Sequence, residues 1–312
     1  MRRIIYPSKE QAVLEDDGCP VPDPGPNEVI VQSSGCGICQ EEIKKFLGTL
    51  GGDFPVNRLG HESVGTVVKV GSDVLTLKEG DFVTTLWSPG FAEYFVVREG
   101  WAVVIDKPER GNEALWISEP SACALNGLVR AEPGEDDRVL LIGAGYMGLL
   151  LTQVFKDSAC AEFLVTDLVD SKLEHSLKLG ATGVIPAAEL QSAGEFNIVI
   201  EAAGGPNMIE QAIDLTCPGG KTIVFADHRH HQNEQMNWDP FISKGIALLA
   251  ANPMSHPDFP IVWKDSVELL KDGTFDQSTL ISHQWPVEDC QEALEYSSSP
   301  DSNYIKGYFS WI

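Results

Sequence analysis

Two cysteines three positions apart, Cys36 and Cys39, are the first residues of this sequence whose types and spacing could do chemistry. A C-x-x-C pair can belong to a metal site, form a redox dithiol, or supply one ligand of a site completed elsewhere. Glu41 and Glu42 follow directly. The spacing alone leaves all three interpretations open, and the choice depends on the partners that the rest of the chain supplies.

Cys39 could be completed to a metal site by three residues that lie farther along the chain. His61 and Glu62 lie together in a Leu-Gly-His-Glu-Ser segment, and Glu119 directly precedes a proline. Cys, His and Glu are credible zinc ligands, and three protein ligands leave a fourth position for water or substrate. The alternatives are a core histidine satisfied by hydrogen bonds and a Glu119 that caps a helix.

A second candidate site begins at the glycines Gly143, Gly145 and Gly148, which have the G-x-G-x-x-G spacing between an apolar strand and a helix. Such a turn brings backbone N–H groups and a helix N-terminus to a pyrophosphate. Asp167 ends the next strand, where a carboxylate binds the ribose 2′-hydroxyl and repels a 2′-phosphate. The pattern predicts NAD rather than NADP. The alternative is a glycine-rich turn with a helix-capping Asp167. The expected coenzyme-binding set also includes Tyr146, Met147 and Lys172.

The elements that would position these residues fall into three stretches. Residues 1–118 contain short β segments separated by Pro and Gly, which is typical of a β barrel or sandwich. From residue 137 onward, apolar strands alternate with helical segments, which predicts a parallel sheet covered on both faces. The last ~55 residues contain two helical segments and a closing strand at 304–312.

Composition narrows the class of protein. The formal net charge of −24 disfavours nucleic acid and anionic lipid as partners. Because no run of 18 apolar residues occurs, we expect no transmembrane segment, and the first residues do not have the pattern of a signal peptide. Seven scattered cysteines suit a reducing cytoplasm rather than a disulfide framework.

Several segments together resemble the zinc-type medium-chain dehydrogenase/reductase superfamily of alcohol, polyol and sugar dehydrogenases. They are residues 22–39, 59–71, 90–97, 119–128 and 280–295. The resemblance implies a two-domain α/β fold, in which a GroES-like β-barrel catalytic domain accompanies a Rossmann domain with a doubly wound parallel sheet. The expected boundaries are 1–120 for the catalytic domain, 121–252 for the NAD-binding domain and 253–312 for a return to the catalytic domain.

The resemblance also implies roles for the candidate residues. Cys39, His61 and Glu119 would be ligands of one catalytic zinc, and Glu62 a carboxylate that exchanges with water on the metal. Cys36 would be a buried neighbour, so the C-x-x-C would hold a single ligand. Glu42 matches an aspartate that orients the ligand histidine.

The sequence departs from the family pattern around the proton relay. Glu41 replaces a hydroxyl residue and could act as a base or a metal ligand. Lys44 stands where some members have a relay histidine, although a solvated lysine explains it equally well. Because so many carboxylates crowd one site, we expect Glu41 or Glu62 to carry a proton at neutral pH.

Other departures concern the surroundings of the site. Few residues separate the segments that flank the family's structural-zinc lobe, so we expect no structural zinc. Trp87 matches a substrate-pocket wall, although it could simply pack the end of the barrel. Asp227 and His228 stand where the family has a glycine at the end of a Rossmann strand; lining the nicotinamide end of the cleft and ordinary loop positions are both open for them, so they receive no role. The polar run 228–235 is expected to be a surface loop.

The implied function is zinc-dependent hydride transfer between NAD and a secondary alcohol, such as a polyol, cyclitol or sugar. The alternatives are a zinc-independent NAD(P)H reductase of the same fold and a non-catalytic NAD-binding sensor. The resemblance implies a homodimer or homotetramer.

Overall fold

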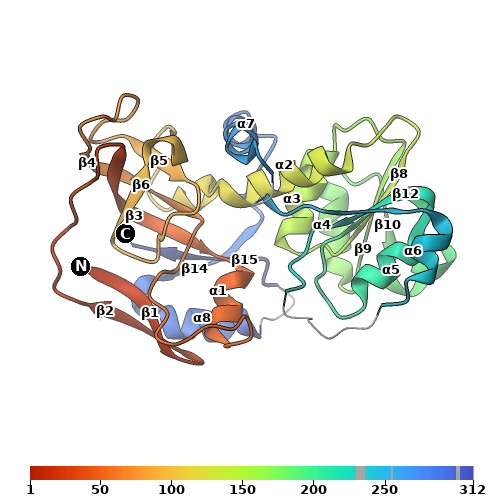
Figure 1. The fold of residues 1–312 in the computed structure, drawn as a ribbon, viewed down its shortest axis with the longest axis horizontal. Coiled ribbons are helices and arrows are strands. Elements are labelled where there is room, and N and C mark those ends of the chain that lie inside the picture. Colours follow the sequence, from red (N-terminus) through yellow and green to blue (C-terminus); the bar gives the residue numbers. More distant parts are fainter. Residues whose placement is uncertain (230–235, 254–255, 300–302, 312) are drawn as a thin grey trace. The chain divides into compact units, whose positions relative to one another are not determined.

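A computed structural model describes all residues except 230–235, 254–255, 300–302 and 312 (Figure 1). Most of the polar run 228–235 therefore lies outside the described residues. The chain divides into two compact units, residues 1–121 with 263–312 and residues 122–262. The sequence analysis placed these divisions after residues 120 and 252. No helix in the described part of the chain has the length and apolar composition needed to cross a membrane.

The first unit is built on a seven-stranded sheet in which β6 pairs with β3 beside the path β14-β15-β3-β4-β5-β7. Its pairs are antiparallel except for β14 with β15. A separate hairpin is formed by β1 and β2. The strands are β1 (Arg2–Ser8), β2 (Gln11–Asp16), β3 (Glu28–Ile38), β4 (Ser63–Val70), β5 (Phe82–Thr85), β6 (Tyr94–Arg98), β7 (Ala102–Val104), β14 (Ile281–Pro286) and β15 (Lys306–Ser310).

Strand β3 organises this unit because it pairs with β15, β4 and β6. Its β-branched start is buried, and its glycine- and cysteine-rich end leads directly into the short helix α1 (Gln40–Phe46). Helix α8 (Cys290–Ser298) packs near α1 and β2. Helix α7 (Phe259–Lys271) begins in the second unit and ends in the first.

The second unit contains a six-stranded parallel sheet with the order β10-β9-β8-β11-β12-β13. The strands are β8 (Arg138–Ile142), β9 (Glu162–Asp167), β10 (Gly183–Pro186), β11 (Phe196–Glu201), β12 (Thr216–Val224) and β13 (Ala247–Ala250). The helices are α3 (Tyr146–Phe155), α4 (Asp170–Leu179), α5 (Met208–Leu215) and α6 (Asp239–Lys244), and α2 (Glu119–Ala131) enters from the first unit.

The order of the parallel strands reverses between β8 and β11, so the sheet is doubly wound. Helix α4 packs on β9 and β10, and α5 packs on β11 and β12. The central strands β8 and β11 are buried over most of their length because both faces of a parallel sheet are covered. This architecture confirms the predicted fold class.

Candidate functional site

Three segments of the first unit converge on His61. Cys39 is the last residue before α1, His61 lies just before β4, and Glu119 begins α2. The possible ligand atoms of Cys39, Glu42 and His61 all lie within 4.8 Å of one another. The same holds for His61, Glu62 and Glu119. The structure therefore places Cys39, Glu62 and Glu119, three residues that the sequence predicts as metal ligands, each close to the fourth, His61, with Cys39 in one group and the two carboxylates in the other.

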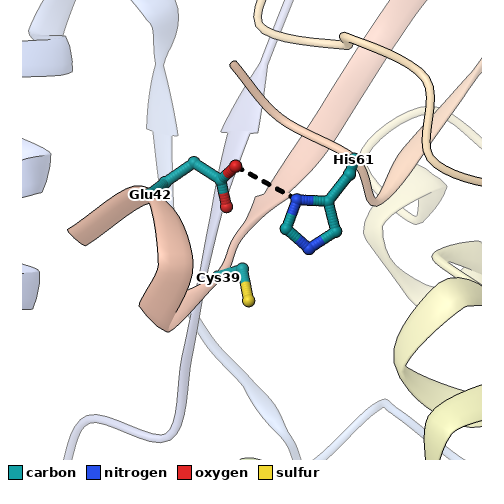
Figure 2. Close-up of side chains that lie close together, drawn as sticks. All are labelled: Cys39, Glu42 and His61. Atoms are coloured by element: carbon teal, nitrogen blue, oxygen red, sulfur yellow. Dashed lines mark hydrogen bonds and ion pairs between the residues drawn. The ribbon is translucent and has the colours of Figure 1, made fainter. Parts of the chain in front are cut away.

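Glu42 has the orienting contact that the sequence predicts. Its Oε1 lies 3.0 Å from Nδ1 of His61 and also accepts the N–H of Gly60 at 3.3 Å. Figure 2 shows the carboxylate on one side of the imidazole and the Cys39 sulfur close to the ring. Because Glu42 holds Nδ1, the other ring nitrogen, Nε2, is the one that can bind a metal.

The charges around His61 favour proton sharing with Cys39. Burial lowers the pKa of His61, but the charges of Glu42 and Cys39 outweigh burial and hold that pKa well above its usual value. Burial raises the pKa of Cys39, and His61 opposes this effect. A metal cation would displace the shared proton, since thiolate and neutral imidazole are the ligand forms.

Cys36 differs from Cys39 in its chemistry. Its side chain is buried, and the hydroxyl of Ser63 donates to its sulfur at 3.5 Å. Burial raises the pKa of Cys36 to about 12, so the thiol keeps its proton. Cys36 and Cys39 are both free cysteines, as are the other five. The geometry agrees with one candidate ligand and one structural thiol.

Glu62 is paired with a lysine that the sequence analysis missed. Lys306, at the start of β15, places Nζ 2.7 Å from one Glu62 oxygen and 2.6 Å from the other. Both side chains are buried. Burial lowers the pKa of Lys306, but the charge of Glu62 outweighs it and the pKa is raised. A lysine inside an otherwise apolar closing strand was the one signal that could have revealed this pair.

Glu41 is also paired, with Lys45 one helical turn later at 2.9 Å. Burial raises the pKa of Glu41, but the hydrogen bond and charge of Lys45 outweigh burial and lower it. This direction is opposite to that expected of a carboxyl group protonated at neutral pH. The expectation counted the crowded carboxylates without Lys45 and Lys306. Lys44, the other predicted relay residue, lies half-buried on α1, and its carbonyl accepts the N–H of Thr49.

Trp87 lies against the third candidate ligand. Its Nε1 donates to Oε1 of Glu119 at 3.3 Å, and its ring meets Trp101 edge-on at 5.8 Å between centroids. Glu119 is buried. Residues 86–93 directly connect β5 to β6, so no lobe is inserted at this point.

In the second unit, the glycine turn has the geometry of a phosphate-binding turn. Gly143 has φ +101°, which favours glycine, and Gly145 directly precedes α3. At Gly148 a Cβ would fall against the carbonyl of Gly143, so only glycine allows this close packing. Asp167 accepts the N–H of Ala144 at 2.7 Å and that of Val169 at 2.9 Å.

The other predicted coenzyme residues lie close to this turn in sequence. Tyr146 is buried at the first position of α3, and the half-buried Met147 follows it. Lys172 is half-buried in the first turn of α4, just after Asp167. The turn and the carboxyl end of β9 thus lie together, as a dinucleotide site requires.

Comparisons with known proteins agree with this architecture. A family described as "Zinc-binding dehydrogenase" matches residues 147–270, and "Alcohol dehydrogenase GroES-like domain" matches residues 25–108. D-altritol 5-dehydrogenase of Agrobacterium fabrum is 32% identical over 72% of this chain and 76% of that protein. Sorbitol dehydrogenase of Ovis aries is 26% identical over 91% and 90%, respectively. The crystal structure of galactitol-1-phosphate dehydrogenase from Escherichia coli superimposes with a TM-score of 0.84 at 21% identity, covering 99% of this chain and all of that one.

The chain therefore belongs to the zinc-type medium-chain dehydrogenase/reductase superfamily, and it is an oxidoreductase. The first unit is the GroES-like domain and the second is the Rossmann domain that the sequence resemblance implied.

Proposed function

We propose that this chain transfers a hydride between NAD and a secondary alcohol of a polyol, cyclitol or sugar at a site with one catalytic zinc and no structural zinc. The placement of Cys39 and of Glu119, each close to the Glu42-oriented His61, carries this proposal. A set of one thiolate, one imidazole and one carboxylate fits zinc, and here Cys39 and His61 are half-buried while Glu119 is buried. Relatives named as sorbitol and altritol dehydrogenases support the substrate class.

In the proposed reaction, an alcohol loses a hydride to NAD and a proton to the protein, giving a carbonyl compound and NADH. Zinc, when bound, would lower the pKa of the substrate hydroxyl. Glu42 would hold the imidazole of His61 in its ligand orientation. Glu41 would accept the proton as an ionised carboxylate, although its lowered pKa makes it a weaker base than an ordinary glutamate. Glu62 would be held by Lys306 and would exchange with water at the metal, while Trp87 would form a wall of the substrate site.

Metal content of the purified protein is the first test. We expect about one zinc per chain by elemental analysis, since a structural zinc site with its own ligands would add a second equivalent. We also expect Cys39→Ala to lose this zinc, because the substitution removes a candidate ligand. Cys19→Ala is the matched control, since Cys19 is exposed and lies outside the ligand set. A wild-type protein that stays metal-free after reconstitution with zinc would contradict the mechanism and favour a zinc-independent reductase or an NAD-binding sensor.

Coenzyme preference is the second test. Asp167 at the carboxyl end of β9 supports NAD, because its charge would repel a 2′-phosphate. We expect kcat/KM for NAD to exceed that for NADP and Asp167→Ala to narrow the ratio, measured with a panel of polyols. A wild type that prefers NADP would overturn this assignment.

The assembly and location follow from the family and the cysteines. We expect a homodimer or homotetramer, which light scattering after gel filtration would measure. Seven free cysteines support a reducing, cytoplasmic location.

A further inference from the structure

A buried carboxylate in the second unit lies outside the residues discussed so far. Glu201 ends β11, and its side chain is fully buried. His228 follows β12 by a few residues, and its Nε2 lies 2.6 Å from Oε2 of Glu201. Because parallel strands end at the same edge, both residues lie at the carboxyl end of the sheet.

Glu201 ties two turns of the backbone together. Its Oε1 accepts the N–H groups of Ala203 at 2.9 Å and Gly204 at 2.7 Å, both in the turn after β11. Its Oε2 accepts from the imidazole of His228, in the turn after β12. The backbone strengthens the link, since the Glu201 carbonyl accepts the N–H groups of Phe225 and Ala226.

The turn after β11 in turn touches the phosphate-binding turn. A Cβ at Gly143 would come 2.8 Å from the nitrogen of Ala203, and Ala202 donates its N–H to the carbonyl of Ile142 at 2.9 Å. Glu201 therefore connects the turns after β11 and β12, and the turn after β11 contacts the turn after β8. They lie where the strand order reverses, which is where dinucleotides bind in doubly wound sheets.

A dinucleotide divides over such a sheet into two mononucleotide halves. Asp167 lies on the β9 side of the glycine turn, toward the adenosine half, and Glu201 and His228 lie on the opposite side. We infer that Glu201 and His228 are positioning residues that shape the seat of the nicotinamide mononucleotide half of the coenzyme. This inference rests on the proposed use of a nicotinamide dinucleotide.

The physical reason is preorganisation. A turn fixed before binding does not have to be ordered by the ligand, so the coenzyme retains more of its binding free energy. Removing the imidazole would leave a buried carboxylate short of one donor, and the turn after β12 would lose its side-chain link to the turn after β11. The adenosine half would keep its own contacts.

The test compares a half ligand with the whole coenzyme. AMP and NAD are titrated separately by calorimetry into wild type, His228→Leu and His228→Gln, because a glutamine amide can replace the Nε2 donor. We expect His228→Leu to raise the Kd for NAD about tenfold or more, the effect of losing one hydrogen bond to a charged group. The Kd for AMP should change less than about twofold, and His228→Gln should recover most of the NAD affinity. His175→Leu, on α4, is the matched control and should change neither value.

The possible outcomes are distinct. If His228→Leu weakens the binding of AMP and of NAD equally, the pair of Glu201 and His228 only stabilises the unit. If the affinity for NAD is unchanged, the pair has no role in coenzyme binding. Either result overturns the inference. Glu201→Gln, which keeps the shape but places an amide against an imidazole N–H, should reproduce the NAD-selective loss if His228→Leu does not fold. Wild type that binds no NAD would overturn the proposed function and this inference together, whereas normal wild-type binding with unaffected variants would overturn the inference alone.

Discussion

At the residue scale, the candidate metal site contains four carboxylates, each with its own donor. The pairs are Glu41 with Lys45, Glu42 with His61, Glu62 with Lys306, and Glu119 with the indole of Trp87. The sequence identified every carboxylate and its motif. It did not identify Lys306 as a partner, because Glu62 and Lys306 are 244 positions apart and meet only through strand pairing.

The ion pair between Glu62 and Lys306 predicts a stability effect. Lys306→Met leaves a buried carboxylate without its partner, which typically costs about 3–5 kcal/mol. Urea unfolding should therefore show a lower free energy of unfolding for this variant, and adding Glu62→Gln should restore part of it. Lys264→Met, at an exposed position on α7, should change little. A Lys306→Met variant as stable as wild type would refute the assigned pairing.

At the element scale, the two units differed in how far the sequence could predict them. Continuous apolar strands alternating with helices from residue 137 predicted the parallel sheet, because burial on both faces leaves a strong local signal. The pairing of β15 with β3 has no such signal. Strand register between distant segments depends on the packed tertiary structure. The glycine turn was predictable because all its parts are adjacent in sequence.

The end of β3 predicts a second stability effect. A Cβ at Gly37 would fall on Oε2 of Glu62, with Cδ1 of Ile117 the next contact at 3.0 Å. Gly37→Ala should therefore displace the carboxylate and cost about 1–3 kcal/mol, the usual penalty of overpacking. Gly100→Ala is the control because a Cβ there meets nothing within 4 Å. Equal urea midpoints for the two variants would contradict this account of the glycine.

At the scale of the whole molecule, the surface carries many acidic groups and the core of the first unit holds two buried phenols that titrate only in alkali. The chain carries a net charge of −24, and its exposed carboxylates keep it negatively charged at neutral pH. In the core of the first unit, Tyr6 and Tyr308 are buried, and their hydroxyls have no hydrogen-bond partner among the described residues. Burial raises the pKa of both phenols well above the ordinary value of 10.0.

These tyrosines predict a loss of stability in alkali. Below about pH 10 both phenols are neutral in the folded and unfolded chain, so their ionisation contributes no pH dependence. Above that pH the unfolded chain releases the two protons while the folded chain retains them, so stability falls by about 1.4 kcal/mol per pH unit for each residue. In urea unfolding between about pH 9.5 and 11, a range around the ordinary phenol pKa of about 10, the free energy of unfolding of wild type should fall with pH. The double variant Tyr6→Phe, Tyr308→Phe should lack the part of this fall that the two phenols cause. If the double variant shows the same pH dependence of the free energy of unfolding as wild type, the two phenols do not cause it. The difference in free energy of unfolding between variant and wild type at pH 7 gives the cost of the altered packing alone.

The position of β15 also determines the order in which the chain can complete itself during synthesis. The second unit is one continuous stretch, residues 122–262, and has all its strands once that stretch has left the ribosome. The first unit needs β15, which follows the whole second unit in the chain, to fill the place between β14 and β3. Until β15 has been made, Glu62 has no Lys306 to neutralise it. The candidate metal site is thus completed only after the second unit has been made, although Cys39, His61 and Glu62 precede that unit in the chain.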